Sequence, residues 1–247
     1  MNNSEEIIAR DKQAEEYENW YVTSKGVLYD FIEKKVILDA LNLQKTDIVL
    51  DAGCGTGRIT RVIAKNCKKV YAVDFSPKSI EVLNRKLKEE DIYNVKTYVC
   101  SILDPLPIPE QVDKIICVQV IQHITNVNER LKAVENLYQK LKFGGCIVIT
   151  VYNWNLFSKR TGNLKEGKWD NGIYYFRFTP NEAIDLLKHC KFKQISINGC
   201  INFWGYSKLN NFGLYKCFYP LGMVDVLLSK FKIYTLLGDF LIVKGIK

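Results

Sequence analysis

The sequence of 247 residues lacks long apolar runs, because no stretch reaches the ~18 uninterrupted apolar residues that a membrane span needs. Its opening segment, MNNSEEIIARDKQAEEYENW, has no basic stretch followed by an apolar one, so no secretory leader is expected there. Internal repeats and low-complexity linkers are absent as well. These absences lead us to expect a cytoplasmic protein. Because 47% of the residues are hydrophobic, we expect the chain to fold as a single domain, residues 1–247, around a proper core.

Closely spaced cysteine pairs of the C-x-x-C type are also missing. The eight cysteines are dispersed along the chain, and several fall inside apolar, strand-like runs. Buried free thiols fit this distribution better than a disulfide framework or a metal site. We therefore expect no bound metal ion and no structural role for disulfides.

The charge of the chain is unevenly distributed, with 35 basic and 27 acidic side chains in total. Residues 151–247 carry 14 basic and 6 acidic side chains, whereas residues 1–50 carry 6 basic and 10 acidic ones. A basic C-terminal part would suit an acidic substrate or RNA, but solvated lysines on helix faces are the favoured interpretation. DNA is not an expected partner, and RNA is not favoured because no appended RNA-binding module is recognisable.

Short β-branched runs alternate with helical periodicity between residues 47 and 142. The near-continuous apolar character of these runs predicts strands that are buried on both faces. Such alternation is typical of an α/β fold with a doubly wound, mostly parallel sheet. The expected strands span residues 47–51, 69–74, 95–100, 114–120, 145–152, 192–199 and 239–246, and the expected helices span 57–66, 77–90, 128–141 and 180–190.

Two aromatic-rich stretches lie outside this alternation. Residues 1–45 contain two amphipathic helical patterns and are interpreted as an N-terminal helical lid over a cofactor-binding core, residues 46–152. Residues 200–237 separate the last two strands and are interpreted as a cap insertion, since a hairpin there needs only about two to five residues. Within the cap, an apolar helical face in residues 221–237 is expected to pack on the sheet or its helices and to anchor an acceptor wall, residues 203–219. The expected members of this face are Val224, Leu227, Leu228, Phe231, Tyr234 and Thr235, and a membrane-surface or dimer role for it is the alternative.

The segment DAGCGTGR forms a glycine-rich loop after the first expected strand. Gly53, Gly55 and Gly57 follow a GxGxG spacing, which differs from the GxGxxG of dinucleotide-binding loops and lets the backbone come close to a ligand. Asp51 would repel a pyrophosphate but suits a ligand that carries positive charge, such as S-adenosylmethionine. Asp74 ends the second strand, where a carboxylate binds ribose hydroxyls in this architecture.

Four segments carry a resemblance to a known family: VLDAGCGTGR, VYAVDFSPKSIEVLNRK, DKIICVQVIQHI and LYQKLKFGGCIVIT. In their order and spacing the sequence resembles the class I S-adenosylmethionine-dependent methyltransferases of the small-molecule type, over roughly residues 47–152. The resemblance implies a Rossmann-like sheet of seven strands with an antiparallel, inserted last strand, and S-adenosylmethionine as cofactor with S-adenosylhomocysteine as product. The cofactor-binding residues that it implies are Asp51, Gly53, Cys54, Gly55, Gly57, Asp74, Phe75, Ser101, Ile102 and Gln119.

Two features of the expected cofactor site are less regular. The family usually places an acid after the third strand, where it meets the adenine amino group, but Ser101 stands there and accepts such a bond more weakly. Family members also often fold an N-terminal helix over the cofactor, so Tyr17 and Tyr21 are candidates for lining the site. Packing of these tyrosines against the sheet is an equally weighted alternative.

His123 follows the fourth strand, close to the expected position of the transferred methyl group. A histidine of near-neutral pKa would take a proton from an attacking hydroxyl or amine, although a packed histidine that fixes the loop is the favoured alternative. Other acceptor contacts are expected in a substrate loop, residues 153–178, and in the cap, where aromatic and basic side chains interleave. These candidates are Trp154, Arg160, Tyr175, Arg177, Trp204 and Tyr215.

The expected activity is methyl transfer to an oxygen or nitrogen atom of a small molecule or peptide, for which an acidic acceptor would suit the basic side chains. A dedicated nucleophile is not needed, because the sulfonium is already electrophilic and the enzyme mainly aligns the reactants. The alternatives are a methyltransferase of RNA, including tRNA, and a non-catalytic S-adenosylmethionine-binding protein. Both a monomer and a homodimer are compatible with the sequence.

Overall fold

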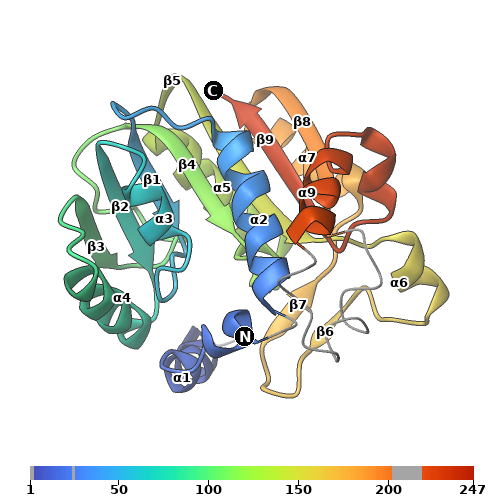
Figure 1. Ribbon diagram of the computed structural model, residues 1–247, viewed down its shortest axis with the longest axis horizontal. Helices are drawn as coiled ribbons and strands as arrows, with labels where there is room; N and C mark the ends of the chain where they lie inside the picture. Colours follow the sequence, from blue (N-terminus) through green and yellow to red (C-terminus); the bar gives the residue numbers. More distant parts are fainter. Residues whose placement is uncertain (1–2, 24–25, 202–218) are drawn as a thin grey trace.

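The fold was analysed in a computed structural model that describes residues 3–23, 26–201 and 219–247. Its centre is a seven-stranded sheet with the order β3-β2-β1-β4-β5-β9-β8 (Figure 1). β9 runs antiparallel to both of its neighbours, whereas the pairs from β3 to β5 are parallel. This confirms the predicted sheet with an inserted last strand. The strands are β1 (Ile48–Ala52), β2 (Lys69–Asp74), β3 (Val95–Val99), β4 (Val112–Val118), β5 (Leu141–Tyr152), β8 (Lys193–Cys200) and β9 (Phe240–Ile246).

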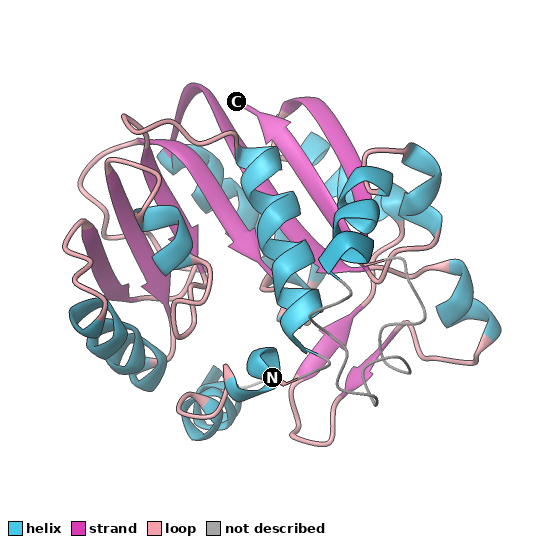
Figure 2. Ribbon diagram, viewed as in Figure 1, coloured by secondary structure: helices cyan, strands magenta, loops and turns pink. Residues whose placement is uncertain are grey.

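Helices cover both faces of this sheet, as Figure 2 shows. Apolar side chains of α2, α3, α4 and α9 pack on one face, and those of α5 and α7 pack on the other. The helices are α1 (Asn3–Gln13), α2 (Gly26–Leu41), α3 (Thr60–Ala64), α4 (Pro77–Glu89), α5 (Val127–Lys140), α6 (Leu156–Arg160), α7 (Pro180–His189) and α9 (Tyr219–Leu228), with 3₁₀ turns η1 (Asn19–Val22), η2 (Ile121–His123) and η5 (Lys232–Leu236).

The helix starts follow local sequence signals. Ser76 caps α4 by accepting a hydrogen bond from the Ser79 amide, and Pro77 occupies the first helical turn. The helix expected from residue 57 begins only at Thr60, because Gly57 has a φ of +86° that a right-handed helix cannot contain. The Gly57 amide instead donates to the Cys54 carbonyl within the loop.

The expected substrate loop contains regular structure that the sequence pattern did not predict. Besides α6, it forms a two-stranded hairpin of β6 (Glu166–Lys168) and β7 (Tyr174–Phe176). A parallel bridge between Asn153 and Phe178 fixes the base of this segment next to the end of β5. Strands of three residues are too short for an alternation of apolar and polar side chains to reveal them.

Helix α9 packs on α2 and β8, as expected for residues 221–237, but through a different face from the predicted one. Val224 and Leu227 of α9 are 40% and 54% exposed, whereas Asp225 and Val226 are buried. The helix is turned this way because the Asp225 carboxylate accepts a hydrogen bond from the Ile201 amide at 3.1 Å. The expected acceptor wall lies almost wholly outside the described residues, and so do Trp204 and Tyr215.

Three further features bear on the function. Seven of the eight cysteines lie in the described part of the chain, and all seven are free thiols, of which six are buried. Within the same residues no group of side chains is arranged to hold a metal ion. None of the described helices combines the length and apolar character that a bilayer crossing requires.

Candidate active site

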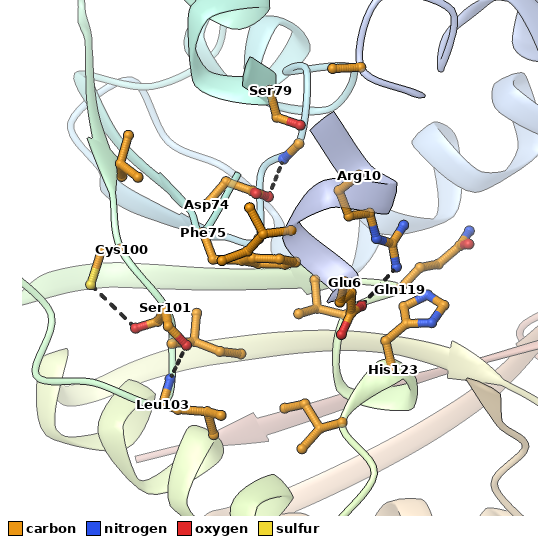
Figure 3. A pocket seen from close by; sticks show the side chains of 18 of the residues that line it. Glu6, Arg10, Asp74, Phe75, Ser79, Cys100, Ser101, Leu103, Gln119 and His123 are labelled. Atoms are coloured by element: carbon orange, nitrogen blue, oxygen red, sulfur yellow. Dashed lines mark hydrogen bonds and ion pairs between the residues drawn. The ribbon is translucent and has the colours of Figure 1, made fainter. Parts of the chain in front are cut away.

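The carboxyl ends of β1 to β4 open into a cavity of about 420 Å³, which is closed on the far side by α1 (Figure 3). Loops that follow these strands meet there because parallel strands all end at the same edge of the sheet. Nine of the residues expected at the cofactor or the methyl group line this cavity together. They are Tyr17, Gly53, Gly55, Asp74, Phe75, Ser101, Ile102, Gln119 and His123.

Asp74 is the buried carboxylate at the centre of the cavity wall. Its two oxygens accept hydrogen bonds from the Gly55 amide at 2.8 Å and from the Ser76 amide at 2.9 Å. Burial raises the pKa of Asp74, while these two backbone bonds act in the opposite direction. Each oxygen keeps a second lone pair, so the carboxylate can accept two more hydrogen bonds from a pair of neighbouring hydroxyls.

The glycines of the loop have different surroundings. Gly55 has a φ of +53°, lines the cavity, and would present a Cβ to open space with no atom within 4 Å. A side chain at Gly53 would lie 2.3 Å from Val120, and one at Gly57 would lie 2.1 Å from Leu83. Gly55 therefore forms the part of the cradle that a Cβ would fill, and Gly57 serves close packing of the loop on α4.

Asp51 and Cys54 line neither of the two cavities described here. The Asp51 carboxylate accepts a hydrogen bond from the Thr60 hydroxyl at 2.6 Å and is 2% exposed. Its burial raises the pKa of Asp51 to about 7. The two side chains thus do not line the cavity in which the other expected cofactor residues meet, and Asp51 instead holds Thr60.

The other end of the cavity is shaped for a flat, apolar group. Phe75 and Ile102 line it, together with Cys100 and Ser101 from the end of β3 (Figure 3). The Ser101 hydroxyl oxygen accepts a hydrogen bond from the Leu103 amide at 3.2 Å, which leaves it one lone pair. This position therefore offers a weaker acceptor than the acid that the family usually has there.

Gln119 is held in place by a buried network that the sequence analysis missed. Its backbone has a φ of +56°, and its side-chain amide donates to Glu33 at 2.5 Å. Glu33, on α2, is fully buried and also forms an ion pair with Arg58, which bonds Asp30 at 2.6 Å. The sequence did contain a signal for this network, namely an acidic residue within the apolar sequence of α2. A carboxylate buried there needs a partner, so its presence indicates a buried polar network.

A second cavity of about 500 Å³ adjoins the first. The two share Arg10, Gln13, Tyr17, Gln119 and His123, so they meet beside the loop after β4. Aromatic side chains dominate the lining of the second cavity: Tyr17, Trp20, Tyr21, Tyr29, Tyr152, Trp169 and Phe240. Tyr21, expected at the cofactor, thus lies in this second cavity and not in the first.

His123 lies at the junction of the two cavities. Its Nδ1 atom is 2.6 Å from the Tyr174 carbonyl oxygen, which can only accept a hydrogen bond, so Nδ1 carries the proton. Burial lowers the pKa of His123 to about 3, and the nearby charge of Arg10 acts in the same direction. The ring is therefore neutral near pH 7, and its Nε2 atom retains a free lone pair.

The other described acceptor candidates do not line either cavity. Arg160 is exposed at the end of α6, and the Trp154 amide donates to the Phe178 carbonyl. Tyr175 stacks on Trp169 with ring centroids 4.3 Å apart, and Arg177 lies 4.6 Å above the Tyr175 ring. Tyr175 and Arg177 thus stabilise the β6–β7 hairpin, which presents Trp169 to the second cavity.

Comparisons with known proteins agree with this geometry. Residues 49–145 match the model of a family described as "Methyltransferase domain". A relative from Methanocaldococcus jannaschii, named "Probable cobalt-precorrin-6B C(15)-methyltransferase (decarboxylating)", is 42% identical over 76 residues, 30% of this chain and 42% of the relative. A ubiquinone biosynthesis O-methyltransferase from Rickettsia canadensis is 30% identical over 124 residues, half of each chain.

Solved structures share the fold over nearly the whole chain. The DhpI–SAH complex has a TM-score of 0.64 at 14% identity and covers 98% of this chain and 95% of its own. An S-adenosylmethionine-dependent methyltransferase from Clostridium acetobutylicum has a TM-score of 0.60 at 16% identity, with coverages of 88% and 91%. At such low identities these likenesses show the fold alone.

The family match over residues 49–145, the curated relatives and the fold agree with the resemblance to class I S-adenosylmethionine-dependent methyltransferases. The chain spans about half, or less, of the length of the first curated relatives that it matches. Their names include C- and O-methyltransferases, so this similarity does not define the accepting atom.

Proposed function

We propose that this chain transfers the methyl group of S-adenosylmethionine to an oxygen or nitrogen atom of a small molecule. One observation carries the proposal: a cavity with the groups that a nucleoside needs meets a second, aromatic cavity at Gln119 and His123. The volume of the second cavity, about 500 Å³, lies in the range of sites for small ligands. Acceptor and cofactor can therefore reach the same point from opposite sides.

The residues of the first cavity fit the cofactor. Asp74 has lone pairs for both ribose hydroxyls, Phe75 and Ile102 offer a slot for the adenine, and Gly55 leaves room where a Cβ would intrude. When bound, S-adenosylmethionine supplies an electrophilic methyl group on a sulfonium, so the protein needs no nucleophile of its own. Among the described residues no nucleophile–base pair stands at the junction, which is consistent with this chemistry.

The protein's own groups orient the acceptor. His123 presents a neutral Nε2 atom at the junction, where it can accept a hydrogen bond from an acceptor hydroxyl and so orient it. With a pKa of about 3, in place of the near-neutral value that a base would need, the ring does not keep the proton that the acceptor loses, and this proton passes to water. The Tyr174 carbonyl holds the ring in the required tautomer. Gln119, fixed by Glu33, shapes the wall between the cavities. Such alignment can supply up to about 7 to 11 kcal/mol of the barrier.

The N-terminal segment acts in this proposal as a lid that keeps water out. Its underside lines the first cavity with Ile7, Ala14 and Tyr17. An acidic row consisting of Asp11, Glu15 and Glu18 holds the segment against the core. The partners of this row are Ser76 (2.5 Å from Asp11), Arg85 (2.7 Å from Glu15), and Thr56, Arg61 and Lys86 (2.7, 2.5 and 2.9 Å from Glu18).

The test is incubation with S-adenosylmethionine labelled in the methyl group, together with separate pools of metabolites, peptides and RNA. We expect label in a small-molecule product that wild-type protein forms and the Asp74→Ala variant does not. Label that appears only in RNA or peptides would refute the acceptor class. Failure of the wild-type protein to bind S-adenosylhomocysteine in calorimetry would refute the proposal as a whole.

A further inference from the structure

The second cavity is bounded by a continuous series of rings, here called the aromatic belt: Tyr17, Tyr21, Trp20, Tyr29, Phe240, Tyr152 and Trp169. Each ring contacts the next, with centroid distances from 5.0 Å for Trp20–Tyr21 to 6.2 Å for Tyr152–Trp169. The belt joins the N-terminal segment, α2, β5, β9 and the β6–β7 hairpin. Residues from five separate parts of the chain thus build one aromatic enclosure.

The belt is electrically neutral at physiological pH. Burial raises the pKa of Tyr152 to about 12 and raises the pKa values of Tyr21 and Tyr29 well above the usual value for a phenol. The nearby carboxylate of Glu33 is bonded to Arg58 and Gln119, so it is already paired. The enclosure therefore suits a planar, uncharged ring, because aromatic rings pack edge-to-face and offset against one another.

A cation stands at the inner end of this enclosure. Arg10 lines both cavities and has a hydrogen-bond partner only in Glu6, at 3.4 Å, among the described residues. Glu6 lines the first cavity alone, and its bond uses one of the five guanidinium donors, so the other donors are available where the two cavities meet. The other charged residues that line the second cavity are Lys12 and Glu16, which are exposed and carry opposite charges.

Building on the proposed function, we infer that the acceptor is a small aromatic acid that carries a hydroxyl group. Its ring lies within the aromatic belt, its anionic group pairs with the Arg10 guanidinium, and its hydroxyl donates to Nε2 of His123. A guanidinium group binds a carboxylate or a similar anion through two parallel hydrogen bonds, and this geometry fixes the orientation of the ring that carries the anion. Three contacts from three directions define one orientation of the acceptor at the junction.

A cationic acceptor is the main rival, since aromatic enclosures also bind ammonium groups. Here, however, Arg10 would repel such a ligand, and no unpaired buried acid at the second cavity is found in the described residues to offset that repulsion. The like charge is placed at the inner end, where solvent screening is weakest. The structure therefore favours the anion over the cation.

The inference is tested by binding of four probes to protein saturated with S-adenosylhomocysteine, at 0.15 M salt. The probes are 3,4-dihydroxybenzoate, catechol, dopamine and cyclohexanecarboxylate. We expect 3,4-dihydroxybenzoate to bind about ten- to a hundredfold more tightly than each of the other three, as one charge-assisted pair and one enclosed ring would give. Equal or tighter binding of dopamine, or no binding of the dihydroxybenzoate, would overturn the inference.

Two variants locate the interaction. Arg10→Gln should abolish the preference for 3,4-dihydroxybenzoate over catechol, whereas Arg160→Gln, a change at an exposed arginine outside both cavities, should leave it intact. Trp169→Leu should weaken both ring probes by similar factors and so preserve the preference. An Arg10→Gln variant that keeps the preference would overturn the inference.

The same measurements separate the two sources of an anion. If Arg10 instead bound the carboxylate of the cofactor, Arg10→Gln would weaken binding of S-adenosylhomocysteine tenfold or more and leave the probe preference unchanged, which refutes the acceptor assignment. We expect an affinity for S-adenosylhomocysteine within threefold of wild type. Tight cofactor binding without discrimination among the probes would refute this inference alone and leave the proposed function standing.

Discussion

Glu18 offers the sharpest test of the N-terminal lid. Its carboxylate accepts hydrogen bonds from Thr56 at 2.7 Å and pairs with Arg61 at 2.5 Å and Lys86 at 2.9 Å. Burial raises the pKa of Glu18, but the bonds from Lys86 and Thr56 and the charge of Arg61 outweigh it and leave the pKa below its ordinary value. The group is therefore ionised at pH 7 and joins the lid to α3 and α4.

Replacement of Glu18 by glutamine removes the charge but keeps the shape and one acceptor oxygen. The side chain is 20% exposed, so the loss lies between that of a surface pair and that of a buried one, about 1 to 2 kcal/mol. Since 1.4 kcal/mol corresponds to a factor of ten, opening of the lid should become about tenfold more frequent. If release of the cofactor requires this opening, its rate rises by the same factor.

The assay is the exchange rate of labelled S-adenosylhomocysteine from preloaded protein. Glu89→Gln is the matched control, because Glu89 is 62% exposed and lies 3.8 Å from Arg85. We expect release from Glu18→Gln to be about tenfold faster than from wild type or the control, and higher salt to accelerate wild type more than the variant. Equal release rates in all three proteins would show that this contact does not gate the cavity.

Three further changes give defined outcomes. Gly55→Ala should weaken S-adenosylhomocysteine binding at least tenfold in calorimetry. Gly144→Ala is the control, since Gly144 also has a positive φ and open space around its Cβ position. Both changes should lower the free energy of unfolding by about 1 kcal/mol, but the control should leave binding unaffected. Asp74→Ala should lower the affinity for S-adenosylhomocysteine a hundredfold or more, while its circular dichroism spectrum remains that of wild type. An unchanged affinity would show that the ribose does not bind Asp74. His123 has a pKa of about 3 when folded and about 6.5 when unfolded, so the unfolded chain takes up a proton that the folded one excludes. The free energy of unfolding should thus fall as the pH drops below about 6.5, by up to about 1.4 kcal/mol per pH unit. In urea denaturation, the free energy of unfolding of His123→Gln should fall less than that of wild type between pH 7 and pH 5. Parallel curves for the two proteins would contradict this.

The sheet and the cradle could be predicted from the sequence because each rests on a local signal. Near-continuous apolar runs mark strands buried on both faces, and the strand ends bring Gly55 and Asp74 to one edge whatever the details of the loops. The positions of Asp51 and Tyr21 could not be predicted in this way. The place of Asp51 depends on its bond with the Thr60 hydroxyl, and that of Tyr21, in the turn η1, on packing against Arg58, which lies 4.0 Å from the centre of its ring.

The aromatic belt shows a different limit of sequence reasoning. Phe240 begins β9, and Tyr152 ends β5, and the antiparallel register pairs these two residues directly. The inserted last strand was expected, so this contact follows from the expected topology once the register is known. Tyr29 and Trp169 give no such signal, because their contacts arise from the docking of α2 and from a hairpin too short for periodicity to predict.

The uneven charge of the chain also finds a structural partner within the molecule. The acidic excess of the N-terminal segment faces basic side chains of α3 and α4, so part of the charge asymmetry serves docking of the lid and not solvation alone. Salt sensitivity is consequently not a specific sign of RNA binding in this protein. If salt loosens the lid, it speeds release of S-adenosylhomocysteine from wild type, and this effect disappears in Glu18→Gln. If salt instead screens an RNA complex, it weakens RNA binding through counterion release in wild type and in Glu18→Gln alike. Salt titration of both ligands in both proteins thus separates a lid held by ion pairs from a surface for nucleic acid.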